Sequence, residues 1–235
     1  MRMKRDRCLK RSMAIPDFAR DILRTLEEAG FEAYCVGGCV RDTLLGREPG
    51  DWDITTSAWP EETLALFGED ALPTGLRHGT VTVRRPGGCA EVTTFRRDGD
   101  YTDHRHPESV AFTDSLTEDL ARRDFTVNAM ALSLRGELRD PFHGREDLAA
   151  GCIRCVGEPV RRFGEDALRI LRGLRFAAVL GFQLEPETAA ALSAAREDLR
   201  AIAPERILTE VRKLLTAERP SAVLREFPEV FGVFW

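Results

Sequence analysis

The chain has 235 residues, of which 43% are hydrophobic, and a formal net charge of −5, so it can form one or two globular domains with buried cores. The negative balance gives no indication of nucleic-acid binding, and no apolar run reaches the length of a membrane span. The basic N-terminus is not followed by an apolar segment, which excludes a signal peptide, so the six scattered cysteines are expected to be reduced thiols of a cytoplasmic protein.

Residues 1–13 are predicted to form a disordered basic leader, because they contain six lysine or arginine residues and one aspartate. Such a charge run suits either RNA attraction or a solvated tail. The following residues 16–29 are predicted to form a helix. Pro16 falls in the first turn, apolar side chains line one face, and Gly30 ends it.

A strand, a glycine turn and a short helix are predicted next. The strand covers residues 31–36, the turn contains Gly37 and Gly38, and the helix covers residues 39–45. Glycines let a backbone approach an anion closely, and a helix N-terminus favours negative charge. Because Arg41 in the first turn can reach the same anion, this stretch predicts a cradle for a triphosphate.

Asp51 and Asp53 follow on a return strand. Side chains two positions apart on a strand share a face, so the two carboxylates are expected side by side. Adjacent carboxylates repel each other unless a cation joins them, and hard oxygen ligands suit Mg²⁺, which also takes substrate phosphates. The pair is therefore predicted to bind metal.

A helix is predicted over residues 60–67, followed by strands over residues 80–83 and 89–95 that a turn at residues 86–88 connects. The second strand contains Glu91. If this strand lies beside the strand of the two aspartates, Glu91 is a third carboxylate at the metals. Otherwise it is an ordinary charged strand residue.

Residues 96–115 are predicted to form a long polar loop, and such loops are usually functional or disordered. A helix is expected over residues 115–124, with a capping box of Ser115 and Glu118. Minor strands at residues 131–134 and 152–156 are expected to flank a loop at residues 140–151. Cys152 and Cys155 form a single C-x-x-C with no second pair at zinc spacing, so no structural metal is predicted there.

Arg122, Asp124 and Asn128 lie at and beyond the end of the predicted helix 115–124. The arginine can bind phosphate oxygens, and either polar side chain could accept a hydrogen bond from a ribose hydroxyl. A salt-bridge cluster at the helix end is the alternative.

From Glu165 onwards the pattern is helical, with further helices expected at residues 186–197, 204–217 and 221–226. Three arginines recur every three residues, at Arg169, Arg172 and Arg175. Like charges at this spacing repel each other, so solvent or an anion must offset them.

In chain order, six motifs resemble the class II nucleotidyltransferases, which are the bacterial CCA-adding tRNA nucleotidyltransferases and the poly(A) polymerases. They are G-G-C-V-R-D at 37–42, L-L-G-R at 44–47, D-W-D-I-T-T at 51–56, E-V-T-T-F-R at 91–96, R-R-D-F-T-V-N-A-M-A at 122–131 and E-D-A-L-R-I-L-R-G-L-R-F at 165–176.

The resemblance implies an α+β fold. A nucleotidyltransferase head of the polymerase beta-like type, with a small mixed or antiparallel sheet and flanking helices, is expected at residues 14–157. An all-α neck that selects the nucleobase is expected at residues 158–235. The helical body and tail regions of the family are expected to be absent, or to follow in a longer natural chain.

The resemblance also implies a function, the template-independent addition of C and A to the 3′ end of tRNA from CTP and ATP, with release of pyrophosphate. Two Mg²⁺ ions are expected at the aspartate pair. A poly(A) polymerase or an A-adding enzyme of the same family is the alternative, although the arginine-rich insert associated with such polymerases is not found. A non-catalytic nucleotide-binding or RNA-binding module is the alternative from another class.

Base choice follows from hydrogen bonding. Cytosine and adenine each present an amino donor beside a ring-nitrogen acceptor, whereas uracil and guanine present the reverse pair. One carboxylate and one arginine therefore select C and A. Asp166 and Arg169, expected one helical turn apart, can supply the pair, with Glu165 orienting the arginine.

The remaining implied roles concern nucleotide binding and a flexible loop associated with the switch from adding C to adding A. The nucleotide-binding set is Gly37, Gly38, Arg41, Arg122, Asp124, Asn128, Glu165, Asp166, Arg169, Arg172 and Arg175. The loop residues are Asp103 and Arg105.

Residues 227–235 contain three phenylalanines, two valines and a tryptophan. Such a segment is expected to fold back on the neck, to bury against a second subunit of a homo-oligomer, or to continue into further chain. Because the net charge is negative, the chain is expected to hold tRNA weakly.

Overall fold

A computed structural model describes residues 15–98 and 110–234. The described chain divides into two compact units. The first comprises residues 15–97, 110–122 and 128–142, and the second comprises residues 98, 123–127 and 143–234. The predicted leader and the loop residues Asp103 and Arg105 lie outside the described residues.

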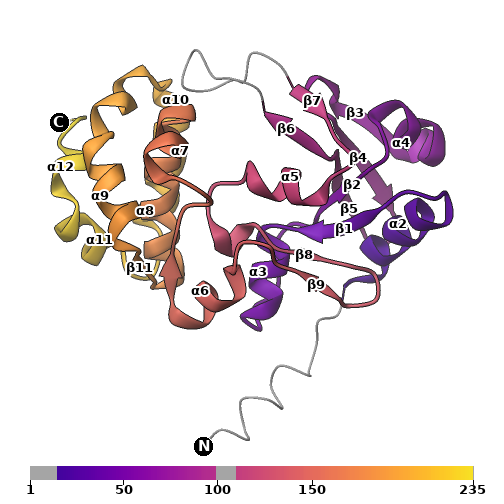
Figure 1. Ribbon diagram of the computed structural model, residues 1–235, viewed down its shortest axis with the longest axis horizontal. Coiled ribbons are helices and arrows are strands. Elements are labelled where there is room, and N and C mark those ends of the chain that lie inside the picture. The colour runs from indigo at the N-terminus through magenta and orange to yellow at the C-terminus, as the bar shows by residue number, and fades with distance from the viewer. Residues whose placement is uncertain (1–14, 99–109, 235) are drawn as a thin grey trace, which may run out of the picture. The chain divides into compact units, whose positions relative to one another are not determined.

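A seven-stranded mixed sheet is the framework of the first unit (Figure 1). Only β2 and β5 pair in parallel, and the other neighbours are antiparallel. This confirms the expected α+β class with a small mixed sheet. In spatial order the strands are β3 (Ala71–Gly75), β4 (Thr80–Arg85), β5 (Gly88–Thr94), β2 (Asp53–Thr56), β1 (Ala33–Val36), β8 (Ala131–Leu132) and β9 (Leu138–Arg139).

Strand alternation gives this sheet one apolar face. Ile54, Val92 and Val81 are partners across three strands, and all are buried. Helices α2 (Asp17–Glu28) and α4 (Pro60–Phe67) pack against the sheet (Figure 1). In the predicted apolar stripe of α2, Ile22, Leu23 and Leu26 are buried and Phe18 is half-buried. Burial of this face leaves the neighbouring strand positions, which carry the acidic residues, on the opposite face.

Two further helices of the first unit are short. Helix α3 (Gly38–Leu44) follows β1, and α5 (Leu116–Ala121) ends three residues before the predicted end. The Ser115 hydroxyl caps α5 by accepting a hydrogen bond from the Glu118 N–H. The Glu118 carboxylate accepts from the Thr113 hydroxyl, so only half of the predicted capping box forms.

Two predicted loops contain regular structure, so those predictions were wrong in part. The ends of the loop at 96–115 form β6 (Arg96–Asp98) and β7 (Val110–Phe112), which pair as a small sheet. The loop at 140–151 contains α6 (Gly144–Ala150), with acidic residues in its first turn and Gly151 in the left-handed conformation at its end.

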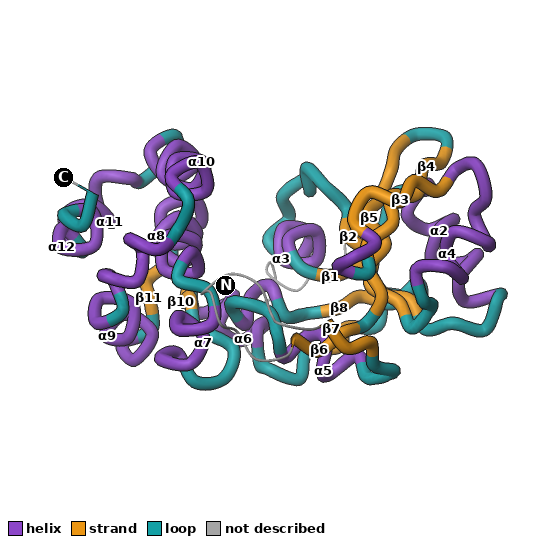
Figure 2. The backbone as a smooth tube through the Cα atoms, turned by 90° about the horizontal axis from the view of Figure 1, so that it is seen from above, coloured by secondary structure: helices purple, strands orange, loops and turns teal. Residues whose placement is uncertain are grey.

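Helices dominate the second unit, and α8 is its centre. Helix α8 buries most of its residues and contacts α7, α10 and α11, and the parallel pair β10 and β11 lies beside it (Figure 2). The bounds are β10 (Cys152–Ile153), α7 (Pro159–Glu165), α8 (Leu168–Leu180), β11 (Gln183–Leu184), α9 (Pro186–Ala194), α10 (Pro204–Leu215), α11 (Pro220–Glu226) and α12 (Pro228–Phe231). Proline opens every one of these helices except α8, which suits its fixed φ and missing N–H.

Part of the apolar C-terminal segment folds back within the second unit, as the first of the three alternatives predicts. Phe227, Val230 and Phe231 are buried there. Among the described residues, no helix has the length and apolar character to cross a bilayer.

Candidate active site

The predicted acidic residues lie together in the first unit. Asp53 opens β2 and is in register with Glu91 on β5 and with Val36 on β1. Residues in register on parallel strands point to the same face, so Asp53 and Glu91 are neighbours. Asp51 precedes β2 by two positions, which corrects the expectation that both aspartates lie on the strand. All three line one cavity of about 970 Å³, whose walls also include Arg47, Trp52, Thr82 and Cys89.

This arrangement fits a metal shared between protein and substrate. In the described part of the chain, no group of three or more histidine, cysteine, aspartate or glutamate side chains is arranged to hold an ion by itself. Mg²⁺ often binds through one or two carboxylates and takes its other ligands from water and substrate phosphates. The paired oxygen donors of Asp51 and Asp53 on the cavity wall suit such a site.

The glycine turn directly follows the strand beside Asp53. Gly37 has a φ of 79°, which strains any other residue, and its N–H donates to the Met130 carbonyl at 3.3 Å. Arg41 is buried on α3, and its Nη1 donates to Asn128 Oδ1 at 2.6 Å. Its Nε and Nη2 donate to the two Asp42 carboxylate oxygens, each at 2.9 Å.

Arg41 and Asn128 are separated by 87 positions, and the structure brings them together. Neither the two glycines nor Arg41 is among the described residues that line the cavity. The glycine turn after β1 and the start of β2 therefore lie at adjacent strand ends. Only the acidic residues line this cavity.

All three members of the arginine row have carboxylate partners inside the second unit, Arg169 through Glu165. Arg172 donates to Asp124 at 2.6 and 2.8 Å, and the Asp124 carboxylate raises the pKa of Arg172. Arg175 pairs with the buried Glu210 of α10 at 2.5 Å and lies over the Phe176 ring. Burial lowers the pKa of Arg175, whereas Glu210 acts in the opposite direction. Carboxylates of the protein thus offset each arginine of the row, whereas the sequence predicted that solvent or an anion would do so.

Glu165 is the last residue of α7 and the common partner of three arginines. Its carboxylate accepts hydrogen bonds from Arg161 at 3.1 Å, from Arg162 at 2.7 Å and from Arg169 at 2.8 Å. Arg169 also donates to the Arg162 carbonyl at 3.2 Å. Glu165 therefore holds the Arg169 guanidinium, as the orientation argument requires.

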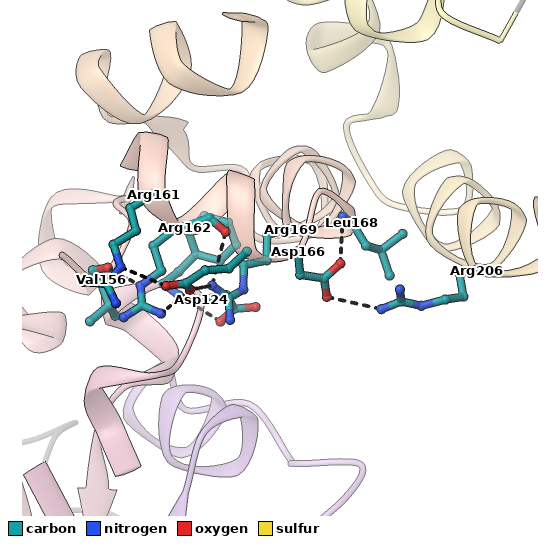
Figure 3. Close-up of polar contacts among 10 residues, drawn as sticks. Asp124, Val156, Arg161, Arg162, Asp166, Leu168, Arg169 and Arg206 are labelled. Carbon is teal, nitrogen blue, oxygen red and sulfur yellow. Dashed lines mark hydrogen bonds and ion pairs between the residues drawn. The ribbon is translucent and has the colours of Figure 1, made fainter. Parts of the chain in front are cut away.

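Asp166 is not on the same helix as Arg169, which corrects the expectation of one continuous helical turn. Its backbone is extended, with φ −143° and ψ 103°, between α7 and α8. The carboxylate accepts from the Leu168 N–H at 3.0 Å and from Arg206 at 3.2 Å (Figure 3). Capping the first turn of α8 in this way favours the break between the helices.

The structure adds Asp119, Arg162 and Arg206 to the neighbourhoods of the predicted site residues. Asp119 contacts Arg122 three positions later. Because residues three apart on a helix are neighbours, the sequence could have indicated this ion pair on the predicted helix. Arg206 belongs to α10, forty positions after Asp166. No local pattern could have indicated it, because its place depends on the packing of α10 against α8.

Comparison with known families gives two matches. Residues 33–154 match the Poly A polymerase head domain, and residues 181–229 match the family described as the probable RNA and SrmB-binding site of polymerase A.

Named relatives are similar over most of this chain. A protein of Levilactobacillus brevis named CCA-adding enzyme is 50% identical over 210 residues, which is 89% of this chain and 53% of the relative. A CCA-adding enzyme of Oceanobacillus iheyensis is 48% identical over 88% of this chain and 52% of its own length. The chain thus spans about half the length of the curated relatives it matches.

Solved structures show the same fold. The crystal structure of the Bacillus stearothermophilus CCA-adding enzyme in complex with CTP matches with a TM-score of 0.81 and 46% identity, over 88% of this chain and 50% of that one. The Thermotoga maritima CCA-adding enzyme complexed with tRNA matches with a TM-score of 0.74 and 27% identity, over 90% and 50%. Because the head-domain match alone covers just over half of the sequence, the chain belongs to the poly(A) polymerase head-domain family, the class II nucleotidyltransferases.

Proposed function

We propose that this chain carries out the nucleotidyl transfer of a CCA-adding enzyme, adding C and A without a template to the 3′ end of tRNA from CTP and ATP. The observation that carries the proposal is the register of Asp53 with Glu91 on parallel strands, with both residues and Asp51 lining one cavity. The relatives named CCA-adding enzyme, and the similar structure that contains CTP, support the choice of substrates.

The reaction is an in-line attack of the tRNA 3′-hydroxyl on the α-phosphate, with pyrophosphate as the leaving group. Asp51 and Asp53 would hold Mg²⁺, which supplies a lowered pKa of the attacking hydroxyl and charge neutralisation at the leaving oxygens. Arg41 and Arg122 bind the triphosphate. Positioning and charge stabilisation account for most of the rate enhancement.

Base choice belongs to the cluster around Glu165. Asp166 accepts a hydrogen bond from the amino group of cytosine or adenine, and Arg169 donates to the adjacent ring nitrogen. The contact of Arg169 with Glu165 supports this assignment, because a fixed guanidinium discriminates between acceptor positions better than a mobile one. Uracil and guanine would present a donor to the arginine and an acceptor to the carboxylate.

The test uses tRNAs that lack the last one, two or three nucleotides of the CCA end, with each nucleotide triphosphate supplied separately and the products sequenced. The proposal predicts addition of C to the two shorter tRNAs and addition of a single A to the tRNA ending in CC. Repeated addition of A alone would instead identify a poly(A)-polymerase activity. Binding of CTP without any product would identify a non-catalytic module.

A further inference from the structure

Asp119 is the most deeply buried acid among those that the structure describes, with no exposed surface. A buried carboxylate is costly unless donors surround it. Its Oδ1 accepts from Nε and Nη2 of Arg122, both at 2.9 Å, and from the Arg96 N–H at 3.4 Å. Its Oδ2 accepts from the Thr55 hydroxyl at 3.0 Å.

These partners come from three parts of the first unit. Thr55 lies on β2, two positions after Asp53 and on the same face of the strand. Arg122 directly follows α5, and Arg96 opens β6. One carboxylate therefore ties the metal-binding strand to the arginine assigned to the triphosphate.

We propose that Asp119 is a positioning residue that fixes the Arg122 guanidinium relative to the strand of Asp53, so that Arg122 meets the triphosphate in a set orientation. This inference rests on the proposed function. Two guanidinium nitrogens on one carboxylate oxygen restrict both the position and the tilt of the Arg122 head group. The Arg122 side chain is only 16% exposed, which restricts it further.

A purely structural role would give a different result. A carboxylate needed only for folding would, when altered, lower the stability and leave the nucleotide affinity of the folded fraction unchanged. A positioning residue changes the KM for nucleotide, and it does so only through the arginine that it holds.

The experiment compares Asp119→Asn with Asp147→Asn in the 235-residue chain. Asp147 is a matched control, because it is also buried and accepts from the Thr126 hydroxyl at 2.7 Å and from Arg154 at 3.2 Å. It has no assigned part in nucleotide binding. The melting temperature, the CTP dissociation constant, and kcat and KM for CTP are measured for each protein.

Both variants are expected to melt at a lower temperature, whereas only Asp119→Asn raises the dissociation constant and KM for CTP, by about tenfold. On an Arg122→Ala background, Asp119→Asn should add no further rise. The proposal would be overturned if Asp119→Asn bound CTP as tightly as Asp147→Asn does. It would also be overturned if Asp119→Asn weakened CTP binding by the full amount on the Arg122→Ala background.

Arg122→Lys decides the question if Asp119→Asn does not fold. Lysine keeps the positive charge but cannot place two nitrogens of a planar group on Asp119. If Asp119 positions Arg122, the KM of Arg122→Lys for CTP should be close to that of Arg122→Ala. A KM of Arg122→Lys close to the wild-type value would overturn the proposal. If the wild-type chain itself transfers no nucleotide, the proposed function fails and this inference with it. If the wild type transfers nucleotide normally and Asp119→Asn leaves the KM for CTP unchanged, only this inference is refuted.

Discussion

Asp53 and Glu91 are directly opposed on parallel strands, so two carboxylates share one side of the sheet. Like charges in register destabilise a sheet, and a cation that joins them removes the repulsion. Without Mg²⁺, Asp53→Asn should therefore melt at the same temperature as the wild type or slightly higher. Addition of Mg²⁺ with CTP should raise the melting temperature of the wild type alone. An equal rise in Asp53→Asn, measured by calorimetry, would remove Asp53 from the metal site.

The cluster around Glu165 gives a prediction about selectivity. Arg169→Ala or Asp166→Ala should reduce the discrimination against UTP and GTP by about tenfold or more, because unpaired polar groups no longer penalise the wrong bases. Arg161→Ala is the matched control. Arg161 contacts the same Glu165 carboxylate, but its side chain is 74% exposed, so its loss should leave selectivity unchanged. Equal losses of rate for all four nucleotides would show that the cluster is not the base selector.

The cysteines differ in their expected reactivity, because only the thiolate reacts with alkylating agents. Burial raises the pKa of Cys155 to about 12, whereas Cys89 is exposed on the wall of the acidic cavity. At pH 8 in the native state, iodoacetamide should label Cys89 well before Cys155. Because the pKa of the Cys155 thiol is higher in the folded than in the unfolded protein, its contribution to stability is complete below the ordinary thiol pKa. That contribution is lost as the pH rises towards 12. Peptide mapping that found Cys155 labelled as fast as Cys89 would contradict this.

At the scale of elements, the pairing of α8 with α10 includes a buried ion pair. Glu210→Gln would leave Arg175 buried without its charged partner, and we expect a loss of about 3 kcal/mol in the free energy of unfolding. Glu197→Gln, which breaks the exposed pair with Arg200, should cost less than about 1 kcal/mol. Chemical denaturation measures both, and similar losses would show that burial of the Arg175 pair contributes little.

Elements with a strong local pattern could be predicted from the sequence. Helix α4 was expected at its observed bounds, because Pro60 begins it and Gly68 follows it. The strands of Asp53 and Glu91 were expected from the sequence. Whether these strands pair was left open, and the shared side of the two carboxylates depends on that pairing. Helix α6 was missed because it has seven residues and begins after a left-handed His143, which no propensity rule favours.

The break at Asp166 was missed for a related reason. The helical pattern was predicted to begin at Glu165, whereas Glu165 ends α7. The interruption depends on an aspartate that caps the next helix and binds Arg206 of a distant one. Contacts between residues far apart in sequence, such as Arg41 with Asn128, decide where the predicted site residues point. Sequence patterns identified these residues but could not identify their partners.

At the scale of the whole molecule, charge limits the attraction for RNA. The net charge is −5, and many arginines that could meet phosphates already contact carboxylates. We therefore expect the 235-residue chain to show a KM for tRNA well above the micromolar range, rising steeply with salt concentration. A micromolar KM that is insensitive to salt, in steady-state kinetics with saturating CTP, would contradict this expectation.

The carboxylates at the start of β2 are proposed to perform metal-dependent nucleotidyl transfer. The most direct test measures pyrophosphate release from CTP by the 235-residue chain, with Mg²⁺ and a high concentration of tRNA that lacks its CCA end. The wild type should release one pyrophosphate for each C added. Asp51→Ala and Asp53→Ala should be slower by more than about a hundredfold while remaining folded. Wild-type rates in either folded variant at saturating Mg²⁺ would contradict the account.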